Sequence, residues 1–158
     1  MLNIGRKMEE IIIGNIDNEQ VITAIVLLFL GIEAMVDYKK RTVSLWFCMG
    51  ALLAALAFNL VSGRMGIAQM SAGCVTGALI LLMSFISKQK IGCGDGVVLA
   101  VIGMWLGGFV SFMTLVIGST AAAAVLSVLL ITGRVKKGQQ TAFVPFLLAG
   151  FVGVIAFV

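Results

Sequence analysis

Residues 96–133 read GVVLAVIGMWLGGFVSFMTLVIGSTAAAAVLSVLLITG, a run of 38 positions without a single charged side chain. As one helix this run would be about 57 Å long, whereas the hydrocarbon layer of a bilayer is about 30 Å thick. The run therefore predicts two membrane-spanning helices joined by a tight turn. The most favourable place for the turn is the segment from Gly107 and Gly108 to Ser111, because glycine tolerates the backbone angles of tight turns.

Apolar runs of similar length recur along the rest of the chain. They are Val21–Val36, Ser44–Val61, Gly66–Ser87 and Thr141–Val158. Hydrophobic residues make up 61% of the 158 residues and charged residues only 11%, whereas about a quarter of a soluble domain is charged. The sequence predicts an all-α, polytopic membrane protein with about six transmembrane helices, in which residues 1–20 form a polar tail and residues 21–158 the membrane domain.

Small residues recur at the spacing that lets helices pack closely in a bilayer. Gly73 and Gly77 form one G-x-x-x-G pair, and Gly103 and Gly107 form another. Because such pairs let two helix backbones approach each other, both are expected at helix–helix contacts.

The composition limits the kinds of site and partner that the chain can have. The chain has no histidine, and its three cysteines stand apart without a C-x-x-C pair, so we expect no metal site, no disulfide framework and no cofactor. The net charge of +4 comes from 11 Lys+Arg and 7 Asp+Glu that are scattered over the chain, which argues against a nucleic-acid partner. The lipid bilayer is the expected surrounding, and the sequence does not specify an oligomeric state.

The basic residues predict how the chain is oriented. The connections after the first, third and fifth predicted spans hold eight basic residues, and those after the second and fourth hold only Arg64. The eight are Lys39, Lys40, Arg41, Lys88, Lys90, Arg134, Lys136 and Lys137. Because short basic loops remain in the cytoplasm, we expect a protein of the inner membrane with both termini outside, although Arg6 and Lys7 oppose this orientation.

Three acidic residues, Glu33, Asp37 and Asp95, lie in or beside the predicted spans. An ionisable group at membrane depth costs several kcal/mol by most scales, so it usually faces a cavity or a partner and marks function. Asp37 ends the first span and Asp95 begins the fourth, so the predicted orientation brings both to the cytoplasmic rim. The two acids can meet if the first and fourth spans are neighbours.

Two close carboxyl groups are the machinery of an aspartic protease, because only one of them ionises easily. The ionised acid takes a proton from water, and the protonated acid donates to the scissile carbonyl. Gly92–Gly96 surrounds Asp95 with a flexible backbone that leaves room for an extended substrate. The residues alone also allow a plainer reading, in which Asp37 is an interfacial anchor beside Lys39–Arg41 and Asp95 is a helix cap.

Three segments resemble the prepilin peptidases, which belong to the G-x-G-D intramembrane aspartic proteases. Gly92–Val97 is similar to the family motif G-x-G-D-x-K, and Asp37–Leu45 is similar to its first motif, an acid followed by a basic stretch. Pro145–Gly150 resembles a late P-F-L segment that is typical of the family. The order and spacing of the three segments agree over nearly the whole chain.

The resemblance implies an endopeptidase that cuts the leader from type IV prepilin or pseudopilin precursors at the cytoplasmic face of the membrane. It implies catalytic roles for Asp37 and Asp95 and supporting roles for Gly92 and Gly94. Long family members also carry a domain with C-x-x-C pairs and methylate the product. Neither feature is present in this sequence, so we expect a peptidase-only form.

Departures from the family pattern keep two alternatives open. Val97 stands where the motif has lysine, and Ser44 and Leu45 stand where proline and asparagine are usual. An inactive assembly factor of the same fold is therefore one alternative. The other is a small proton- or cation-coupled transporter that uses the three acids. A transporter would need those acids near the midplane and repeat symmetry, and the sequence indicates neither.

Two further residues are candidates for supporting the site. Glu33 lies four residues before Asp37 on the same helical face, where it either tunes that acid, lines a wet cavity or bonds a neighbour. Pro145 lacks an N–H and frees the carbonyl of Thr141 four residues earlier, so we expect it to bend the last span near the cleft.

The orientation can be tested by labelling. In a chain freed of its own cysteines, cysteines introduced at Lys40, Lys88 and Lys136 should react with an impermeant thiol reagent only from the cytoplasmic side, and one at Arg64 only from outside. If positions 40 and 88 react from opposite sides, the two aspartates lie at opposite rims and cannot form a pair.

Overall fold

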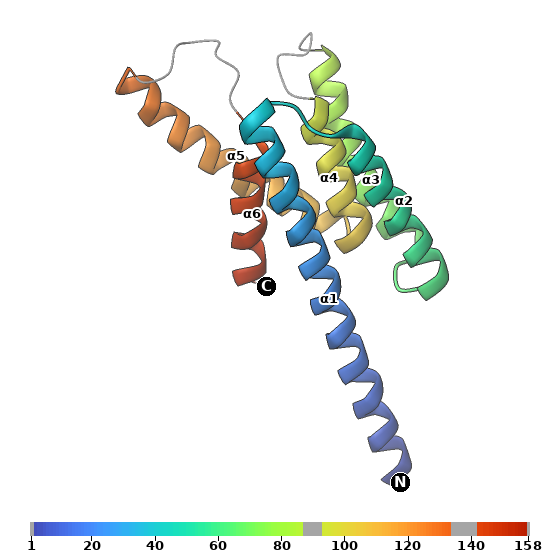
Figure 1. Ribbon diagram of the computed structural model, residues 1–158. Helices are drawn as coiled ribbons and strands as arrows, with labels where there is room; N and C mark the ends of the chain where they lie inside the picture. The colour runs from blue at the N-terminus through green and yellow to red at the C-terminus, as the bar shows by residue number, and fades with distance from the viewer. Residues whose placement is uncertain (1, 87–92, 134–141, 158) are drawn as a thin grey trace.

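The computed structural model describes residues 2–86, 93–133 and 142–157, for residues 2–17 the backbone alone. Six helices follow one another in these ranges: α1 (Leu2–Lys40), α2 (Leu45–Ser62), α3 (Ile67–Ile86), α4 (Cys93–Leu106), α5 (Gly108–Ile131) and α6 (Val144–Phe157). They alternate in direction, so that the ends of α1, α3 and α5 lie at the same end of the bundle as the starts of α2, α4 and α6 (Figure 1). The predicted all-α polytopic fold is confirmed.

The helices fall into two classes of length. Four segments are long and apolar enough to cross a membrane: Asn18–Lys40, Leu45–Ser62, Ile67–Ile86 and Gly108–Ile131. By contrast, α4 and α6 have only 14 residues each, about 21 Å of helix against a hydrocarbon layer of about 30 Å. Both short helices begin at the end of the bundle where α1 ends (Figure 1).

The first helix is longer than the predicted first span. Its backbone is helical from Leu2 and continues through the polar residues that were expected to form a tail. Glutamate and lysine propagate a helix about as well as leucine does, and no proline interrupts the segment. Because the apolar part begins at Asn18, a polar section and a membrane-spanning section share one helix.

The turn between α4 and α5 lies where the charge-free run predicts it. The only residue between the two helices is Gly107, whose φ of 95° is a conformation that favours glycine. On the far side of the turn the hydroxyl of Ser111 donates to the carbonyl of Leu99 at 2.7 Å, which ties the start of α5 back to α4.

Glycine brings α3 and α4 into direct backbone contact. A Cβ added to Gly73 would meet the backbone of Gly103, and one added to Gly77 would lie 2.6 Å from the carbonyl oxygen of Gly96 and from Cβ of Ala100. The first predicted pair therefore lies at a contact. The second does not act as a pair, because Gly107 lies in the turn, and the small face of α4 is formed by Gly96, Ala100 and Gly103.

A second glycine contact places α6 against α5. A Cβ on Gly118 would lie 2.9 Å from the carbonyl oxygen of Phe146, and a Cβ on Gly150 would lie 2.6 Å from the backbone nitrogen of Gly118. Because Phe146 is in the first turn of α6, this contact holds the start of that helix against α5.

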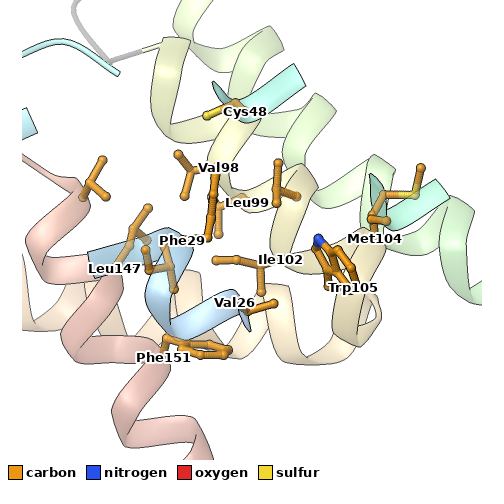
Figure 2. Packing of buried hydrophobic residues seen from close by; sticks show 14 of the residues in the cluster. Val26, Phe29, Cys48, Val98, Leu99, Ile102, Met104, Trp105, Leu147 and Phe151 are labelled. Atoms are coloured by element: carbon orange, nitrogen blue, oxygen red, sulfur yellow. The ribbon is translucent and has the colours of Figure 1, made fainter. Parts of the chain in front are cut away.

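The apolar core lies where α1, α4 and α6 meet. Figure 2 shows Val26 and Phe29 of α1 packed with Ile102 of α4 and with Leu147 and Phe151 of α6. All five side chains are buried. The contact makes α1 a direct neighbour of α4, as the pairing of the two aspartates requires.

We expect Gly73→Ala to destabilise the folded protein by about 1–3 kcal/mol, because the new methyl group meets backbone that cannot move aside without shifting a helix. The matched control is Gly50→Ala in α2, where nothing lies within 4 Å of the added Cβ. There alanine should leave stability unchanged or raise it by up to about 1 kcal/mol. Unfolding in detergent, followed by helical circular dichroism, measures both variants, and equal stabilities would contradict the close α3–α4 contact.

Candidate active site

The buried face of α1 ends in two acids. Ile22, Val26 and Leu30 are buried at helical spacing, and Glu33 and Asp37 continue the same stripe toward the end of the helix. Both carboxyl groups are thus turned into the bundle and away from lipid, because they share the face that packs against α4 and α6.

Asp95 reaches the same place from α4. It lies in the first turn of that helix and is only 8% exposed, against 6% for Asp37. The two carboxyl groups are close enough for a direct electrostatic interaction. The structure therefore brings together two acids that are 58 positions apart in sequence.

The start of α6 supplies a hydrogen bond to the first of these acids. The backbone N–H of Val144 donates to Oδ2 of Asp37 at 3.0 Å. Val144 is the first residue of α6, and the carbonyl of Phe143 before it accepts the bonds from Phe146 and Leu147 that begin the helix. The N–H of Val144 is therefore one of the donors that a helix leaves without an intrahelical partner.

Glycines on either side of Asp95 let α4 approach its neighbours. A Cβ on Gly94 would lie 2.5 Å from Cβ of Val43, in the connection between α1 and α2, and a Cβ on Gly96 would lie 2.8 Å from Leu81 of α3. The sequence led us to expect open space for a substrate strand beside Gly94. In the structure, Val43 of this chain fills that space. Gly92 lies outside the described residues.

Glu33 joins the end of α1 to the start of α2. It is completely buried, its Oε2 accepts the backbone N–H of Ser44 at 3.1 Å, and its Oε1 lies 3.6 Å from the thiol of Cys48. Of the roles considered for this acid, the structure has it bonding a neighbour. In the described ranges, no group of three or more His, Cys, Asp and Glu side chains is placed to share a metal ion.

Pro145 does not bend α6. The helix begins at Val144, so Pro145 lies in the first turn, where its missing N–H interrupts no intrahelical bond. The expected bend is therefore wrong, and Thr141, whose carbonyl it was to free, lies outside the described residues. The same proline has another meaning in the sequence, which we overlooked. Because proline favours the first turn of a helix, it could have predicted where α6 begins and hence which backbone N–H, that of Val144, is free to bond Asp37.

Another polar region lies at the opposite end of the bundle. There Arg64 donates to the carbonyl of Trp105 at 3.2 Å and lies 3.6 Å from the carboxylate of Glu19. A cavity of about 550 Å³ is lined by these two charged residues together with Asn18, Phe58, Ser62, Met65, Gln69 and Leu106. None of the candidate site residues lines this cavity.

Comparison with known proteins gave one match. The sequence model of a protein family described as the type IV leader peptidase family matches residues 24–130. The matched range includes Asp37 and Asp95 and covers more than half of the chain. A search of curated proteins and a search of solved structures each gave no significant match.

Substitutions at Glu33 should separate a bonding role from a chemical one. Glu33→Gln keeps a carbonyl oxygen for the N–H of Ser44, so we expect its free energy of unfolding to stay within about 1 kcal/mol of that of the unchanged chain. Glu33→Leu leaves that N–H unpaired and should cost about 1–3 kcal/mol. Unfolding in detergent compares the two, and equal losses in both would show that the bond to Ser44 is not what Glu33 contributes.

Proposed function

The chain belongs to the type IV leader peptidase family, and we propose that it is an aspartic endopeptidase whose catalytic pair is Asp37 and Asp95. The observation that carries this proposal is the meeting of two buried carboxyl groups from α1 and α4. Glu33, Asp37 and Asp95 are the buried acids among the described residues with placed side chains, and Glu33 is engaged with the start of α2. A membrane-embedded aspartic peptidase needs such a pair where a peptide bond can reach water.

The geometry suits the chemistry of hydrolysis by two acids. Two neighbouring carboxyl groups can share one proton, because ionising both places like charges side by side. One acid can then accept a proton from water while the other donates to the carbonyl oxygen of the scissile bond. The pair lies where α1 ends and α4 and α6 begin (Figure 1), and we propose that water and an extended peptide reach it from this end of the bundle.

We further propose that the substrate is a type IV prepilin or pseudopilin precursor, cut between its basic leader and its hydrophobic segment. Support comes from the family and from the position of the pair. A bond at the junction of a polar leader and a membrane helix lies at the rim of the bilayer, and Asp37 is only three residues from the last residue of α1. Lys39, Lys40 and Arg41 are exposed beside it, which favours the cytoplasmic face.

The alternatives fit the structure less well. A transporter site is expected near the midplane, whereas Asp37 and Asp95 lie at the ends of their helices. Glu33, the third acid of that alternative, is engaged with the start of α2. For an inactive factor, the main argument is Val97 in place of lysine, but Val97 packs against the apolar core, where it serves the fold of the helix that carries Asp95.

The proposal predicts that Asp37→Asn and Asp95→Asn each lower cleavage of a prepilin by at least about 10³-fold while the protein still folds, because neither acid alone can divide the proton transfers. The assay is cleavage of a purified prepilin, followed by gel shift and mass spectrometry. The matched control is Glu19→Gln, an exposed acid that pairs with Arg64 at the opposite end of the bundle.

Glu19→Gln should cleave like the unchanged chain. Near-normal turnover in either aspartate variant would remove that residue from the mechanism. If the unchanged chain cuts no prepilin or pseudopilin, the proposed substrate class is wrong.

A further inference from the structure

The start of α6 and the end of α1 meet through one backbone hydrogen bond. The N–H of Val144 donates to Oδ2 of Asp37 at 3.0 Å, and Val144 is completely buried while Asp37 is 6% exposed. Within the helix this N–H has no acceptor, because the first intrahelical bonds are made by Phe146 and Leu147. Asp37 therefore takes a donor that α6 would otherwise leave unpaired in an apolar surrounding.

The donor is held in place by packing that does not involve Asp37. Pro145 restricts the backbone immediately after Val144. Gly150 packs against the backbone of Gly118 in α5, and Leu147, one turn after Val144, is buried in the core (Figure 2). The first turn of α6 is thus a rigid element and not a loop that follows the carboxyl group.

The start of α6 presents Asp37 with the positive end of a helix dipole as well as with an N–H donor. A helix N-terminus carries a partial positive charge, and a hydrogen bond from N–H to a carboxylate is stronger than one to a neutral acid. The residues of α6 from Val144 to Phe157 include no ionisable side chain. The group that faces Asp37 from α4 is Asp95, and Glu33 on α1 is turned to Ser44. Lys39, Lys40 and Arg41, at the exposed end of α1, are the basic groups near this end of the bundle among the residues that the structure describes.

We infer that the first N–H of α6 is the positioning group of the catalytic pair, which holds Asp37 as the carboxylate that activates water and leaves Asp95 to supply the proton. This inference rests on the proposed function. It makes Val144 a positioning residue that acts through Asp37 and has no contact of its own with the substrate.

Hydrolysis of the peptide bond then proceeds in two stages. Asp37 takes a proton from water as the water oxygen bonds to the scissile carbonyl carbon, and Asp95 gives its proton to the carbonyl oxygen. When the intermediate collapses, the C–N bond breaks, the leaving nitrogen takes the proton from Asp37, and Asp95 recovers one from an intermediate hydroxyl. Peptide and water become a carboxylic acid and an amine, and both acids return to their starting states.

The test removes the N–H and compares the result with a variant that keeps it. Val144→Pro deletes the hydrogen, and proline suits the first position of a helix. Val144→Ala keeps the N–H and reports the cost of losing two methyl groups. On a prepilin peptide we expect kcat of the proline variant to be roughly ten- to hundredfold below that of the alanine variant, the range for losing a hydrogen bond to a charged group. KM should agree within about twofold, because substrate binding is not affected.

Two additions separate this role from a loss of structure. Ile67→Pro places proline at the first residue of α3, at the other end of the bundle (Figure 1), and should leave kcat and KM unchanged. If Val144→Pro loses its helical circular dichroism, an ester in place of the amide at position 144, introduced with the hydroxy-acid analogue of valine, removes the same hydrogen and keeps the side chain. The ester variant is compared with the unchanged chain, and the same ten- to hundredfold loss of kcat is expected on the same basis.

A kcat within about threefold of the comparison protein, in a folded variant that lacks the N–H, overturns the inference. A rise in KM with kcat unchanged also overturns it, since the N–H would then serve binding. If the unchanged chain cleaves no prepilin, the proposed function fails first.

Discussion

The position of α4 is the constraint on which the rest of this bundle depends. Glycine residues on one face of α4, which have no side chain, make that position possible. Ten of its 14 residues are buried, and it contacts α1, α2, α3 and α5. In a bilayer no hydrophobic gain draws two helices together, so close van der Waals contact has to hold them. Gly96 and Gly103 allow that contact with Gly77 and Gly73 of α3. Asp95, next to Gly96, is thereby directed to the side where α1 passes.

Hydrogen bonds hold the other side of the same helix. Asn59 of α2 donates to the carbonyl of Met104 at 2.8 Å, and the indole N–H of Trp105 donates to the carbonyl of Ala51 at 3.2 Å. An unpaired donor at membrane depth costs several kcal/mol, so these bonds fasten α2 to α4 as well as satisfying the two N–H donors. With α3 on one side and α2 on the other, α4 has little freedom to carry Asp95 away from its partner.

The candidate site is assembled from segments that lie far apart in the sequence. Glu33 accepts the N–H of Ser44 and so determines where α2 begins. The residue before Ser44 is Val43, and it rests on Gly94 beside the second acid. The connection between α1 and α2 therefore covers the start of α4, while the start of α6 holds Asp37 from the other direction. The geometry of the pair therefore depends on these connections as well as on the two aspartates.

The sequence alone determined the class of fold, the turn at Gly107 and the place of Asp37 and Asp95 at the ends of their helices, because these follow from local properties. The length of an apolar run can be compared directly with the thickness of a bilayer, and a glycine can indicate a turn. An acid in an apolar run costs free energy wherever its helix lies in the bundle. Only the tertiary structure decided that Glu33 bonds Ser44, that Val43 fills the space beside Gly94, and that α6 begins at Val144 with its N–H on Asp37. Each of these contacts joins two different segments of the chain. Its energy depends on the distance between their backbones, and the pattern of residues within one helix does not specify that distance.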